Sequence, residues 1–236
     1  MYYHIAGIIS SLIFFLTIGG IFSQLEKLKE RSKAKLQHNQ LPSAVLSTNQ
    51  AASSFLAFFS FYIYGLSLAR FNYYLVGTRF PAILLTLALL FEIARDRKDR
   101  ISRAVFIACT LLFLLVSVFV IASPTLRDLV RVGSSSMILV VTAIIAQGYL
   151  HQVLLIRRSG ATGAVSKRYH QLLLAKDLAT MGFSLSMGLQ DGWPVMLLAS
   201  VSALTKIITL WHFRWARLSP LATTRRDGTG GELPEY

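Results

Sequence analysis

Three ionisable residues interrupt the apolar stretches of this chain: Lys176 and Asp177 are adjacent in one stretch, and Lys206 lies in the next. A charged side chain at bilayer depth costs at least ~2.5–3.5 kcal/mol on insertion scales, so such residues are usually paired or functional. Asp177 could carry a proton or a cation, and a lysine could hold an anionic group. Adjacent residues point about 100° apart on a helix, so we expect Asp177 to pair with Lys206 and Lys176 to find another partner. A purely structural salt bridge is the alternative.

A second set of polar residues surrounds Arg79. Asn72, Arg79 and Thr86 share one face of a helix because they recur at two-turn spacing. Arg79 is expected to be a fixed cation for a carboxylate or a phosphate, unless its long side chain extends to the membrane surface. Two smaller polar residues complete the candidate solute-binding set. The whole set is Lys176, Asp177, Lys206, Arg79, Asn72, Ser202 and Asn49.

Seven apolar stretches must position these residues, and each is about the ~20 residues that a helix needs to cross a bilayer. Apolar residues make up 54% of the chain, and its formal net charge is +13. The basic residues gather in alternate connections, which predicts an integral membrane protein with its N-terminus outside and its C-terminus in the cytoplasm. We expect the plasma (bacterial inner) membrane, and we attribute the charge to topology and not to nucleic-acid binding. The predicted spans are 5–23, 44–69, 72–94, 102–123, 134–156, 169–189 and 193–216.

The connections suggest an internal duplication. Short links around 70–72 and around Asp191-Gly192 predict two antiparallel hairpins, and a Gly-xxx-Gln pattern ends the first and the fifth spans at Gln24 and Gln152. Two parallel copies of three helices require one extra crossing, which the apolar span 102–123 supplies. The predicted fold is an all-α membrane protein with seven transmembrane helices, two parallel three-helix bundles joined by an inversion helix (3+1+3). The predicted parts are 1–100, 101–126, 127–217 and a disordered cytoplasmic tail, 218–236.

This pattern resembles the PQ-loop/SWEET superfamily of seven-helix membrane transporters over residues 5–216. The clearest local similarity is the segment from Gln152 through a basic loop and small residues to Ser166. The resemblance implies two bundles that exchange between inward-facing and outward-facing states and move sugars, cystine or cationic amino acids. The related KDEL receptors bind a peptide carboxylate instead. The chain departs from the family because Ser23 and His151 replace the proline before each glutamine, which leaves Pro81 and Pro194 as candidate hinges.

The expected function is therefore a small-solute transporter, with Asp177 as a candidate proton carrier and a polar, zwitterionic or anionic substrate. A non-transporting receptor or scaffold of the same fold is the main alternative. A retinal-type photoreceptor with a Schiff base on Lys206 is a third, although Ser202 stands where a carboxylate is expected. The chain contains no motif of a hydrolase or a phosphate-binding enzyme, so we expect no enzyme, cofactor or metal. The expected partners are a small solute and the lipid bilayer, and self-association is left open.

Overall fold

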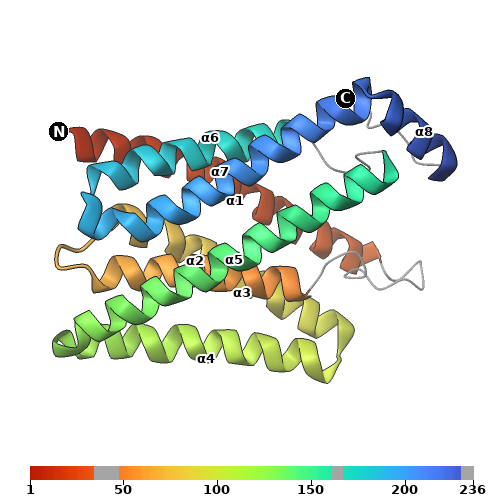
Figure 1. Ribbon diagram of the computed structural model, residues 1–236. Coiled ribbons are helices and arrows are strands. Elements are labelled where there is room, and N and C mark those ends of the chain that lie inside the picture. Colours follow the sequence, from red (N-terminus) through yellow and green to blue (C-terminus); the bar gives the residue numbers. More distant parts are fainter. Residues whose placement is uncertain (35–47, 161–166, 230–236) are drawn as a thin grey trace. The chain divides into compact units, whose positions relative to one another are not determined.

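Helices form nearly all of the computed structural model, which describes residues 1–34, 48–160 and 167–229 (Figure 1). No strand occurs in these ranges, so the all-α class is confirmed for them. A short 3-10 helix, η1 (Pro124–Leu126), precedes α5, and α8 (Pro220–Thr229) follows α7. The long helices are α1 (Tyr2–Ala34), α2 (Thr48–Ser67), α3 (Tyr73–Arg97), α4 (Arg100–Ala122), α5 (Arg127–Ser159), α6 (Lys167–Ser186) and α7 (Leu189–Leu218).

Five helices in the described ranges are long and apolar enough to cross a membrane: α1 over Tyr2–Gly19, and α3, α4, α5 and α7. The remaining two long helices, α2 and α6, fall short because of their composition. Helix α2 begins with the polar run 48–50, and α6 begins with two basic residues and carries Lys176 and Asp177 at its middle. Several long apolar helices are compatible with an integral membrane protein. Seven crossings in a 3+1+3 arrangement stay a prediction.

Both predicted hairpins are present, but one of the two turns lies elsewhere. The α2–α3 turn occupies 68–72, as expected. The α6–α7 turn lies at Met187–Gly188, so the prediction of a turn at Asp191-Gly192 is wrong. Gly188 has a φ of 83°, which glycine adopts without strain. Asp191 instead stands in the first turn of α7, where a carboxylate is favoured by the positive end of the helix dipole.

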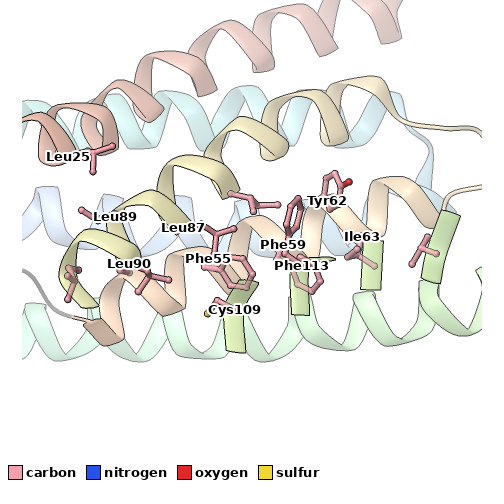
Figure 2. Packing of buried hydrophobic residues seen from close by; sticks show 14 residues of the cluster. Leu25, Phe55, Phe59, Tyr62, Ile63, Leu87, Leu89, Leu90, Cys109 and Phe113 are labelled. Atoms are coloured by element: carbon pink, nitrogen blue, oxygen red, sulfur yellow. The ribbon is translucent and has the colours of Figure 1, made fainter. Parts of the chain in front are cut away.

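One compact unit, Phe14–Val141, contains α2, α3 and α4, and is called the α2–α4 unit here. Its core is an apolar cluster to which all three helices contribute, with Phe55 and Phe59 from α2, Leu90 from α3, and Cys109 and Phe113 from α4 (Figure 2). Most other side chains of α4 are exposed. Helix α4 thus packs one face on α2 and α3 and leaves a face suited to lipid, since its exposed residues from Ala104 onward are aliphatic or aromatic.

The other unit, Met1–Ile13 with Thr142–Tyr236, contains the packed pair α6 and α7 and is called the α6–α7 unit here. Helix α8 packs on the end of α7. This helix corrects the prediction of a disordered tail over 218–236, because its residues up to Thr229 are helical. Pro220 opens α8 at the first helical position, where proline fits best. Residues 230–236 of the predicted tail lie outside the described residues.

The two units do not coincide with the predicted parts 1–100, 101–126 and 127–217. Helices α1 and α5 each divide between units, after Ile13 and after Val141 respectively. Helix α4, which was expected to be a separate linker, packs against α2 and α3. The duplication itself stays a prediction.

Candidate functional site

Helices α6 and α7 carry the candidate site on faces lined by polar residues. These residues recur at three-, four- and seven-residue spacing, which places them on one side of each helix. Several hydroxyl groups donate to a carbonyl oxygen one turn earlier: Thr180 to Lys176 and Thr209 to Thr205, both at 2.8 Å. These hydroxyls therefore find their hydrogen-bond acceptors within their own helix. Charged groups make the contacts between the two helices that are described next. The buried polar residues are His170, Asp177, Thr180 and Ser184 on α6, and Ser202, Thr205, Lys206, Thr209 and His212 on α7.

Asp177 lies at the centre of an ion cluster and is only 1% exposed. Its Oδ2 atom is 3.1 Å from Nζ of Lys206, which confirms the predicted pair across the hairpin. Its Oδ1 atom is 2.9 Å from Nζ of Lys176, so the prediction that these neighbours do not pair is wrong. The four-carbon lysine stem is flexible enough to bend around the helix to an adjacent carboxylate. The cluster of Lys176, Asp177 and Lys206 has one carboxylate for two ammonium groups and therefore one excess positive charge.

The ammonium group of Lys206 contacts oxygen atoms of two residues and one aromatic ring. Its Nζ donates to Ser202 Oγ at 2.5 Å and to the Ser202 carbonyl oxygen at 3.2 Å, in addition to facing Asp177. Nζ thus donates two hydrogen bonds to Ser202 and forms an ion pair with Oδ2 of Asp177, an oxygen that accepts no hydrogen bond among the described residues. The Tyr149 ring of α5 lies 4.4 Å from Nζ, within cation–π range. Ser202, predicted to bind solute, thus serves as an acceptor for Lys206.

Lys176 differs from Lys206 in its accessibility. The side chain of Lys176 is 20% exposed, against 3% for Lys206. The contact between Lys176 and Asp177 is therefore the more accessible of the two, and Lys206 would still hold the carboxylate if that contact opened. A contact between opposite charges that opens in this way presents one anionic and one cationic group side by side. A zwitterion can satisfy both, with its ammonium on Asp177 and its carboxylate on Lys176.

Arg79 lies in the α2–α4 unit and is 6% exposed. Its Cζ atom lies 4.1 Å from the centre of the Phe14 ring and 5.4 Å from that of Phe61. Its Nη1 atom donates to Thr78 Oγ1 at 2.6 Å. The alternative in which Arg79 extends to the membrane surface is wrong, because the guanidinium is buried between aromatic rings. The expectation of a fixed, buried cation agrees with this geometry.

The other predicted residues lie at separate places. Asn72 caps α3, since its Oδ1 accepts the N–H of Leu75 at 3.0 Å, and Asn49 is exposed near the start of α2. Pro81 and Pro194 lie inside α3 and α7, where each removes one backbone hydrogen bond. Their role as hinges stays a prediction. The side chains of two further predicted residues, on α1 and α5, lie outside what the structure describes: Gln24 and Gln152.

Aromatic partners of the cations are what the sequence reasoning missed. Tyr149, Phe14 and Phe61 stand among many other aromatic residues, and no spacing marks them out. The sequence also gave no sign of an apolar hollow of about 340 Å³ at the α6–α7 turn, lined among others by Trp193 and Met196. Within the described ranges, no three His, Cys, Asp or Glu residues gather closely enough to hold a metal ion.

Comparisons of this chain with models of protein families, with curated proteins and with solved structures find no match.

Proposed function

We propose that this protein is a small-solute membrane transporter of the PQ-loop/SWEET type, whose substrate is polar and zwitterionic or anionic. The observation that supports this best is the buried cluster of Lys176, Asp177 and Lys206, with its excess positive charge. Buried charge inside long apolar helices is expensive, and function is a common reason to retain it. The proposed location is the plasma (bacterial inner) membrane, with the N-terminus outside.

The cluster suggests how a solute would bind. The solute carboxylate takes Nζ of Lys176, and its ammonium takes Oδ1 of Asp177, so each ion exchanges one partner for another. Lys206 keeps Oδ2 of Asp177 in place. No new charge is left unpaired in this exchange, which limits the desolvation penalty.

Protonation of Asp177 would couple the solute to a proton. A proton on Asp177 removes the negative charge of the cluster. The two ammonium groups of the cluster then repel each other without compensation. The cluster then attracts an anionic group more strongly, and loss of the proton reverses the effect. For an anionic solute, proton binding and solute binding therefore favour each other, which favours symport. A zwitterion whose ammonium takes Oδ1 of Asp177 competes with the proton for that carboxylate instead, which favours exchange of one for the other.

Flux into sealed vesicles that contain the purified protein tests the proposal. Amino acids, organic acids and sugars are compared under an imposed pH gradient. We expect uptake of a zwitterion or an anion that Lys176→Met and Asp177→Asn reduce at least tenfold. The matched control is Arg168→Gln, which removes an exposed cation from the same helix. Uptake that is the same in wild type and both cluster variants would contradict the proposal.

A non-transporting receptor or scaffold is the second candidate. The contacts of Lys206 favour it, because an ammonium paired with Asp177 and held by two hydrogen bonds to Ser202 can serve as a tie between α6 and α7. The absence of proline before Gln24 and Gln152 points the same way. Ligand binding that raises the melting temperature, without flux in vesicles, would support this candidate over transport.

A further inference from the structure

Arg79 is a buried cation without a carboxylate partner among the described residues. Its contacts there are one hydrogen bond to Thr78 and the rings of Phe14 and Phe61. Its Nε atom is fully buried and has no hydrogen-bond partner. Buried N–H groups are nearly always satisfied, and buried charges are nearly always paired. Arg79 is therefore a buried cation with one unsatisfied donor.

The part of the guanidinium that makes no hydrogen bond determines the kind of ligand. Nη1 is engaged by Thr78, and the two aromatic rings contact Cζ, with the Phe14 ring at 4.1 Å. What remains is the edge that carries Nε, where an arginine binds a carboxylate or a phosphate through two parallel hydrogen bonds. We propose that this Nε edge of Arg79 is a binding site for an oxyanion, a carboxylate or a phosphate group, in the α2–α4 unit.

Energetics favour an external anion over a purely structural role. Cation–π contacts recover less free energy than an unpaired buried charge costs. Thr78 supplies a single neutral acceptor, which is a weaker partner than a carboxylate. An anion at Nε satisfies the orphan donor and the charge together. This site does not rest on the proposed transport, because it uses none of the residues of the α6–α7 cluster.

The test is the melting temperature of the full-length protein in a neutral detergent. Acetate, succinate and inorganic phosphate each replace chloride at constant ionic strength, and phosphatidylglycerol is compared with phosphatidylcholine in mixed micelles. In wild type we expect one oxyanion to raise the melting temperature in proportion to the logarithm of its concentration above Kd. Arg79→Met should abolish the part of this shift that Lys176→Met keeps. Arg79→Lys should keep it with a Kd about tenfold higher, because the two-pronged contact is lost.

Controls separate the site from other cations and from the cluster. Arg70→Met removes an exposed arginine at the α2–α3 turn and should leave the shift intact. Lys176→Met removes the accessible ammonium of the α6–α7 cluster, so any part of a shift that Lys176→Met loses and Arg79→Met keeps belongs to that cluster. Without oxyanion, Arg79→Met should melt no lower than wild type, since a buried unpaired charge has been removed. If Arg79 is merely structural, Arg79→Met melts lower at every oxyanion concentration and keeps the shift, which overturns the proposal.

The source of the oxyanion follows from the same experiment. A shift with acetate, succinate or phosphate that depends on Arg79 identifies a soluble ligand. A shift with phosphatidylglycerol alone that depends on Arg79 identifies a lipid headgroup. Both results support the site. The absence of an Arg79-dependent shift with all of these probes overturns the site. None of these outcomes decides whether the protein transports, which the vesicle flux of the Asp177 variants tests.

Discussion

Replacement of Asp177 by asparagine should be the most destabilising single change in the ion cluster. At 3.1 Å and an effective dielectric constant of ~20, the attraction between Asp177 and Lys206 is about 5 kcal/mol before desolvation is subtracted. Removal of one partner of a buried ion pair typically costs about 3–5 kcal/mol, because the other charge is left uncompensated. We expect a loss in this range for Asp177→Asn. Lys176→Met should cost about 1 kcal/mol, since Lys176 is partly exposed and its loss leaves the pair with Lys206 intact.

The assay is chemical and thermal unfolding in detergent at neutral pH, arranged as a double-mutant cycle. Lys206→Met added to Asp177→Asn removes the stranded ammonium, so the double variant should recover much of the lost stability. Asp128→Asn, which removes an exposed carboxylate from α5, is the matched control and should change stability by less than ~1 kcal/mol. A value for Asp177→Asn within ~1 kcal/mol of wild type would refute the reasoning. So would a double variant that is no more stable than Asp177→Asn.

Two further predictions concern the helix ends. A methyl group at Gly192 would overlap the carbonyl oxygen of Ser184, so Gly192→Ala should force α6 and α7 apart and lower stability by about 1–3 kcal/mol or more. Gly182→Ala, which meets no atom within 4 Å, should not lower the melting temperature, and equal losses in the two variants would contradict the close approach. Asp99 accepts the backbone N–H of Ser102 at 2.7 Å, and this hydrogen bond lowers the pKa of Asp99 below its ordinary value of 3.8. Asp99 therefore contributes stability above pH 3.8 and loses it as the pH falls through the lowered pKa. Asp99→Asn should flatten the decline of the melting temperature at acid pH, and an unchanged decline would show that other carboxylates cause it.

Apolar runs predicted the long helices, because an apolar stretch of this length has few alternatives to a helix. They did not predict where the helices end. Helix α1 continues to Ala34, well past the predicted end at 23. The added segment is rich in Leu, Glu, Lys and Arg, which are strong helix formers. The change from apolar to charged residues therefore changes what the side chains can contact, while the backbone stays helical. The span 5–23 therefore marked the apolar part of a longer helix.

The candidate site was predictable in part, for a reason that the ion cluster shows. A short turn places α6 and α7 side by side, which brings Asp177 and Lys206 within reach of each other although the first lies ten residues before the turn and the second eighteen after it. The spacing of residues on a helix does not determine how far a flexible side chain bends. Lys176 bends to its neighbour by rotation about its own bonds, and helix periodicity describes only the direction in which a side chain leaves the backbone.

The two buried cations, Lys206 and Arg79, pose opposite physical problems. Lys206 has a counter-ion, two hydrogen-bond acceptors in Ser202 and an aromatic ring, so a ligand can reach its cluster only by displacing an existing contact. Binding there is an exchange in which Asp177 is one of the partners. Arg79 has an unsatisfied Nε and no counter-ion among the described residues, so a ligand adds a bond without breaking one. Anion affinity at Arg79 should therefore be unchanged in Asp177→Asn, whereas solute affinity at the cluster should change in this variant. Measurement of both affinities in wild type and in Asp177→Asn would separate the two sites, since a shared response is not expected from their contacts.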